Sequence, residues 1–143
     1  MTTTNKPATW FWVISAIAVI WNLMGVMAYL AQVMMSPEAL QAMPENERLL
    51  IESVPAWSIS AFAIAVWGST LGGILLLLRK KMATPVFIIA FVGIVVQMYY
   101  NVFMSKAFEV YGPGGIAMPI MVFTIGVFLI WFSRMSTANG WLV

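Results

Sequence analysis

The sequence predicts an all-α fold, a four-helix transmembrane bundle with short amphipathic helices in one loop. Of its 143 residues, 62% are hydrophobic and only 8% are charged, whereas a soluble domain carries roughly 25% charged residues. The apolar residues gather in four runs that contain no charge. Each run is close to the length of about 20 residues that a helix needs to cross a bilayer. In lipid only helices or closed barrels satisfy the backbone, and these runs lack the alternation of barrel strands.

The four spans belong to one integral membrane domain, residues 1–143, because the chain is short enough for a single domain. We expect them at about residues 10–32, 57–78, 84–104 and 116–132. The first run is too long for a signal peptide and lacks a small-residue cleavage site. We therefore expect it to be a retained span.

The connection of residues 36–57 predicts two short helices outside the spans. Ser36 followed by Pro37 is typical of an N-cap and a first-turn proline. Pro44 starts a second short helix, Pro55 ends it, and leucine, isoleucine and valine side chains supply an apolar face. Such a pair lies on the membrane or caps the bundle. It is either a structured connector, the interpretation that we favour, or a lid over an outward-facing cavity.

The charges between the spans predict the orientation. One side receives five basic residues and no acid, while the other receives two basic residues and all five acids. Basic residues of short loops stay in the cytoplasm, so we expect both termini there. The five basic residues are Lys6, Arg79, Lys80, Lys81 and Arg134. Indole rings settle at the membrane interfaces, and we expect this of Trp10, Trp12, Trp57 and Trp131.

The missing residue types limit the chemistry. The chain has no Cys and no His, which excludes disulfides, Cys/His zinc sites, His-ligated haem and His-based triads. We expect no metal and no cofactor. The net charge of +2 is too small to suggest nucleic acid as a partner. Charge-free spans offer no carrier for a proton relay, and only Glu52 and Glu109 remain as acid–base candidates, so we do not expect an enzyme.

Polar side chains inside the apolar runs form the candidate site. Small and polar residues of the first span recur at steps of three and four, which places Asn22 and Tyr29 on one face. Gln97 and Asn101 share a face of the third span, and Ser69 adjoins a small-residue face of the second. The candidate ligand-binding residues are Asn22, Tyr29, Ser69, Gln97, Tyr100 and Asn101. The same residues are also candidates for interhelical hydrogen bonds, each worth roughly 0.6–2 kcal/mol.

Several local motifs carry a family resemblance. Pro55–Ala56–Trp57 precedes a helix with small residues from Gly68 to Gly73, and then come a leucine run, the basic turn 79–81 and Ala83–Thr84–Pro85. In this order, within residues 45–87, they resemble a family of small four-helix bacterial inner-membrane proteins of unestablished function. The likeness extends over most of the chain and includes the following residues: Trp21, Asn22, Gly25 and Gln97. Such proteins are often labelled sugar transporters, so the resemblance implies a bacterial inner membrane and transport.

The residues and the resemblance together predict a protein that binds or transports a small neutral or apolar molecule. It would do so through an outward-facing polar pocket in the bundle. A transport path needs more than one such small unit, so we expect a homo-oligomer in the lipid bilayer. The alternative is a non-catalytic accessory or assembly subunit of a larger membrane complex. In that case the small-residue faces and the methionines pack against partner chains.

Overall fold

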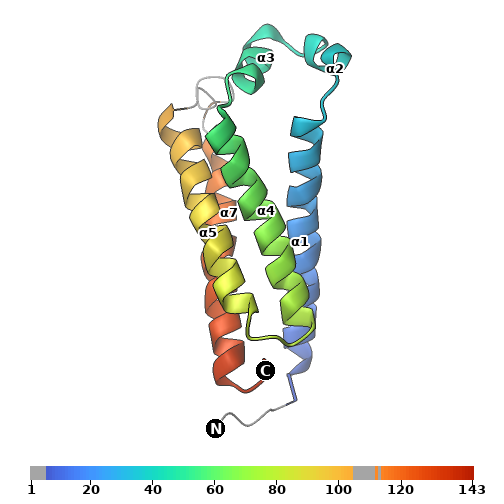
Figure 1. Ribbon diagram of the computed structural model, residues 1–143, viewed down its shortest axis with the longest axis vertical. Coiled ribbons are helices and arrows are strands. Elements are labelled where there is room, and N and C mark those ends of the chain that lie inside the picture. Colours follow the sequence, from blue (N-terminus) through green and yellow to red (C-terminus); the bar gives the residue numbers. More distant parts are fainter. Residues whose placement is uncertain (1–5, 105–111, 113) are drawn as a thin grey trace.

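The protein is a bundle of four long helices, seen in a computed structural model that describes residues 6–104, 112 and 114–143. The long helices are α1 (Thr9–Val33), α4 (Ala56–Leu77), α5 (Ala83–Tyr99) and α7 (Gly114–Ala138). They run side by side, and the start of α1 lies at the same end of the bundle as the last residues of the chain (Figure 1). All four spans are long and apolar enough to cross a membrane. The predicted all-α four-helix fold is confirmed.

Two helices differ in detail from the predicted spans. The third span changes from the α-helix α5 to a π-helical turn, η1 (Tyr100–Met104). The fourth continues past the expected end at residue 132 to Ala138. Polar residues do not stop α7, because their hydroxyls bond to carbonyls of the preceding turn: Ser136 donates to the main-chain oxygen of Phe132 at 2.8 Å.

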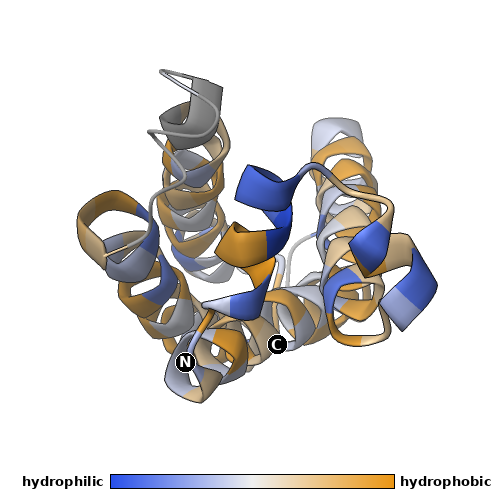
Figure 2. Ribbon diagram, turned by 90° about the horizontal axis from the view of Figure 1, so that it is seen from above, coloured by the Kyte–Doolittle hydropathy of each residue, from blue (hydrophilic) through white to orange (hydrophobic). Residues whose placement is uncertain are grey.

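The connection between α1 and α4 contains the two short helices that the sequence predicts. They are α2 (Pro37–Gln41) and α3 (Glu45–Glu52), and the Ser36 hydroxyl oxygen accepts a hydrogen bond from the Ala39 amide at 3.1 Å. Seen from above, α3 lies over the middle of the bundle (Figure 2). We call this end of the bundle the capped end. Glu52 is exposed on α3, and Glu109 lies outside the described residues.

The long helices pack in the order α1, α4, α5, α7, with α4 between α1 and α5. Glycines allow the close approach, as the small-residue face of the second span predicts. A Cβ atom on Gly93 of α5 would lie 2.8 Å from the main-chain oxygen of Ala61 in α4, and one on Gly72 would lie 2.6 Å from the Phe87 ring. Only hydrogen fits at these two positions.

Aromatic rings and the last residues of the chain close the opposite end of the bundle, which we call the terminal end. Phe11 of α1 stacks on Phe132 of α7 with ring centroids 5.7 Å apart, and Trp141 packs edge-on to Phe11. Leu142 is fully buried in the same cluster. The Val143 amide donates to the Arg79 main-chain oxygen at 2.9 Å, which ties this segment to the α4–α5 turn. These residues form a terminal seal.

Candidate ligand-binding cavity

A cavity of about 1090 Å³ lies among the four long helices. Ligand pockets usually hold roughly 300–1000 Å³, so this one has room for a molecule of substantial size. Its wall comes from α1, α4, α5, η1 and α7, and Leu50, Ile51 and Val54 from α3 and the residues after it also contribute. Most lining side chains are apolar, and none of those within the described residues is charged.

Five of the six residues predicted from the sequence line this cavity: Asn22, Ser69, Gln97, Tyr100 and Asn101. Tyr29 is not among the lining residues. Its ring packs edge-on against Phe62 with centroids 5.5 Å apart, and Phe62 supplies the cavity wall at that point. The helical spacing thus brings most of the predicted set together, and their role in binding stays a prediction.

Asn22 joins two helices and lines the cavity as well. Its side chain is only 6% exposed, and its Nδ2 donates a 2.9 Å hydrogen bond to the main-chain oxygen of Ser69 in α4. The bond uses one of the two amide hydrogens. As a structural residue, Asn22 therefore has a specific hydrogen-bond partner on α4. Because Asn22 also lies on the cavity wall, its side chain is available to a ligand as well.

Two oxygen atoms on the wall are buried without a hydrogen-bond partner within the part of the chain that the structure describes. They are Oγ of Ser58, a residue with no exposed surface, and Oε1 of Gln97. A buried polar atom without a partner costs about 1–3 kcal/mol. Both residues line the cavity, so a bound molecule is one means of satisfying them.

Tyr100 and Asn101 reach the cavity from the π-helical turn. Such turns occur often at functional sites, because the extra residue in the turn redirects the side chains that follow. Tyr100 is 6% exposed, and Trp57 packs edge-on against its ring at 5.7 Å. Trp57 precedes Ser58 in the chain, so this aromatic contact brings the start of α4 next to the end of α5.

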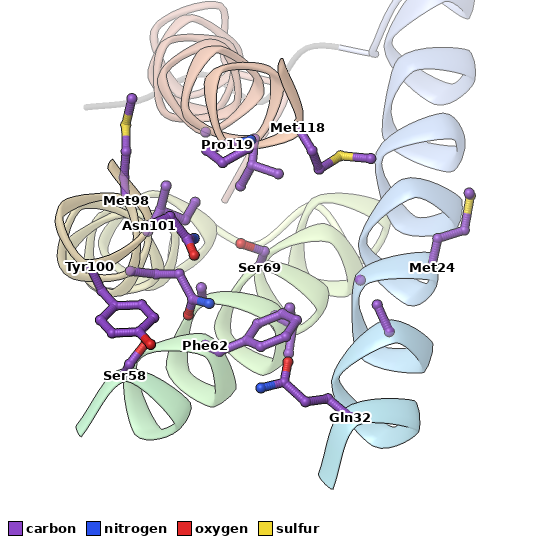
Figure 3. A pocket seen from close by; sticks show the side chains of 18 of the residues that line it. Met24, Gln32, Ser58, Phe62, Ser69, Met98, Tyr100, Asn101, Met118 and Pro119 are labelled. Carbon is purple, nitrogen blue, oxygen red and sulfur yellow. The ribbon is translucent and has the colours of Figure 1, made fainter. Parts of the chain in front are cut away.

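Most of the polar lining residues lie near one end of the cavity. Ser58 lies in the first turn of α4, Gln32 in the last turn of α1, and Asn101 just beyond α5, which places all three near the capped end. The close-up shows them on three sides of the pocket (Figure 3). Toward the terminal seal the α7 wall is aliphatic, with Ile125 and Leu129, while α1 and α4 contribute the hydrogen-bonded pair Asn22 and Ser69. The cavity thus has a mostly polar capped end and an apolar wall on α7.

The sequence reasoning missed Ser58 and Phe62. Ser58 follows Trp57 at the start of a span, where a serine is ordinary, and Phe62 is one of nine phenylalanines. A signal was present, because Ser58, Ala65 and Ser69 recur at helical spacing on α4. This stripe extends the predicted small-residue face back to the beginning of the helix.

The fold and the cavity define a class, a multi-pass four-helix membrane protein with a partly polar cavity inside the bundle. Comparison with known proteins found that no family model, curated protein or solved structure matches this chain. The resemblance to small inner-membrane proteins rests on the motifs of residues 45–87 and stays a prediction. The cavity itself is therefore the feature that bears on function.

Proposed function

We propose that this protein binds a small uncharged molecule inside its bundle, in a bacterial inner membrane. The observation that carries the proposal is the pair of buried oxygens on the cavity wall, Ser58 Oγ and Gln97 Oε1, that have no hydrogen-bond partner among the described residues. A molecule with hydrogen-bond donors would satisfy both once their side chains turn toward the cavity, and it would remove their desolvation cost. The aliphatic lining would hold its apolar part.

The absence of charge in the described part of the lining supports an uncharged molecule. None of the lining residues that the structure describes is acidic or basic, and an ion beside them would lose its hydration without gaining a counter-ion from them. Amide and hydroxyl groups can recognise a neutral molecule through hydrogen bonds. Asn22, Tyr100 and Asn101 supply further groups of this kind.

The orientation proposed from the basic residues places the termini in the cytoplasm and α3 outside. The terminal seal then closes the cytoplasmic end of the cavity, and α3 covers its outer end. In this proposal the molecule first binds in the cavity from the outer side of the membrane. Transport across the membrane would need the seal to open, and we propose that a second copy of the chain takes part in it.

Analysis of co-purified molecules tests the proposal. The purified protein is extracted with organic solvent, and the extract is examined by mass spectrometry. In the variant Ala28→Phe a larger side chain projects from α1 into the cavity that Ala28 lines. The matched control is Met27→Phe, because Met27 is the neighbouring residue, is 70% exposed and does not line the cavity.

We expect a bound molecule in the wild type and in Met27→Phe, reduced at least tenfold in Ala28→Phe. Equal amounts in all three proteins, or no bound molecule in any of them, would contradict the proposal. If other protein chains co-purify in fixed ratio and no small molecule does, the alternative role as an accessory subunit of a larger membrane complex is favoured.

A further inference from the structure

We infer that the ligand is an amphiphile, with an uncharged hydrogen-bonding head and one apolar chain, and that it enters from the lipid between α1 and α7. This inference rests on the proposed function and specifies its ligand class and its route. Three observations carry it: the open side of the bundle, the two methionines beside it, and the apolar α7 wall that continues below the mostly polar capped end of the cavity.

The open side follows from the order of packing. Close packing joins α1 to α4, α4 to α5 and α5 to α7, and no comparable packing joins α7 back to α1 in the described residues. The aromatic rings of Phe11 and Phe132 bring α1 and α7 together at the terminal seal. Above the seal, the cavity is bounded by α1 on one side and α7 on the other.

Met24 of α1 and Met118 of α7 mark where the cavity reaches the outside of the bundle. Each lines the cavity, yet Met24 is 60% exposed and Met118 is 57% exposed. Figure 3 shows Met118 extending from α7 toward α1. Methionine side chains are unbranched and flexible, so they can move aside for a molecule and close behind it. We call this pair the lateral portal.

The lining of the cavity matches the two parts of an amphiphile. Along α1 it extends from Trp21 to Gln32, about 16 Å at 1.5 Å per residue. This is roughly half of the 30 Å thickness of the hydrocarbon core, or one leaflet. The head would meet Ser58 and Gln97 near the capped end, and the chain would lie along Leu129 toward the terminal seal.

Three probes separate the parts of this inference: 1-dodecanoylglycerol, dodecanoate at pH 8 and glycerol. The first has an uncharged head and a chain, the second has the same chain with an anionic head, and the third has the head alone. Each is added to the purified full-length protein, and binding is measured by native mass spectrometry. We expect 1-dodecanoylglycerol to bind at least tenfold more tightly than either other probe, and Ala28→Phe to abolish this difference.

The outcomes distinguish this inference from the proposed function. Suppose that 1-dodecanoylglycerol does not bind, while the wild type still carries a different molecule that Ala28→Phe loses. Then the inference that the ligand is an amphiphile is wrong, and the proposed function stands. If the wild type binds neither the probe nor any co-purified molecule, both fail. If dodecanoate binds as tightly as 1-dodecanoylglycerol, the inference that the head of the ligand is uncharged is overturned.

The route is tested by narrowing the lateral portal in protein reconstituted into vesicles. Met118→Trp and Met24→Trp each add bulk at the portal, and Met121→Trp is the control because Met121 is 48% exposed on α7 and does not line the cavity. We expect both portal variants to load 1-dodecanoylglycerol at least fivefold more slowly than the control. If both load as fast as Met121→Trp, while all melt at similar temperatures, entry between α1 and α7 is overturned.

Discussion

The side-chain amide of Asn22 in α1 donates a hydrogen bond to the main-chain oxygen of Ser69 in α4, at a distance of 2.9 Å. The acceptor lies inside a helix, where the amide four residues later is its regular partner. Removing Asn22 therefore leaves no group of α4 without a hydrogen bond. Bonds between transmembrane helices average about 0.6 kcal/mol, which makes this one a modest contribution to stability.

Asn22→Leu separates the structural role of this residue from its role in binding. We expect the free energy of unfolding to change by about 1 kcal/mol or less, while the amount of bound molecule falls. Unfolding in detergent and mass spectrometry of the extract measure the two effects. Ser69→Ala is the control for the stability measurement alone, because Ser69 also lines the cavity, and in it the hydrogen bond remains since its acceptor is main chain. A loss above about 3 kcal/mol with the bound molecule retained would make Asn22 purely structural.

Ser58→Ala removes a buried hydroxyl that has no partner among the described residues. We expect the ligand-free protein to keep its stability or to gain up to about 1 kcal/mol, because a desolvated polar atom is lost. The control is Ser133→Ala: Ser133 is also fully buried, but it accepts from Thr84 at 3.0 Å and donates to Ile130. This control should lose about 1 kcal/mol. Equal losses in both variants would mean that the Ser58 hydroxyl has a partner in the folded protein.

Gly93→Ala tests the contact between α4 and α5. The added Cβ would lie 2.8 Å from the Ala61 oxygen and 3.0 Å from the Ala65 nitrogen, both main-chain atoms that cannot rotate away. Overpacking of this kind costs about 1–3 kcal/mol, so the melting temperature in detergent should fall. Val92→Ala is the control, because Val92 is the adjacent residue and is 58% exposed. If Gly93→Ala and Val92→Ala melt at the same temperature, α4 and α5 are farther apart than described.

Leu142→Ala tests the terminal seal. The side chain of Leu142 is 1% exposed, while that of its neighbour Val143 is 50% exposed. Truncating a buried leucine costs about 2–5 kcal/mol, and we expect the same change at Val143 to cost less than about 0.5 kcal/mol. Thermal unfolding of the two variants measures the difference. Similar melting temperatures would show that the last residues do not pack against the bundle in solution.

Cysteine labelling tests the proposed orientation, and the chain has no cysteine of its own. Gln41→Cys lies on α2 and Met82→Cys on the α4–α5 turn, both at exposed positions. In intact cells an impermeant thiol reagent should label Gln41→Cys and leave Met82→Cys unlabelled until the membrane is opened. The reverse pattern would invert the topology.

The sequence by itself determined the spans, because apolar composition and length are local properties of a segment. It also determined α2, since Ser36 and Pro37 act within a single turn. Helical spacing brought Gln97 and Asn101 to the cavity without knowledge of their neighbours. These predictions needed no information about how one helix packs on another.

Tertiary structure decided the rest, because contacts between distant residues have no local signal. Asn22 and Ser69 are 47 positions apart, and only the packing of α1 on α4 makes them partners. Tyr29 shares the helical pattern of Asn22, yet Phe62 of α4 supplies the cavity wall beside it. The Ser58 oxygen has no hydrogen-bond partner among the described residues only because of what surrounds it. Whether a polar atom is satisfied depends on neighbours brought together by folding.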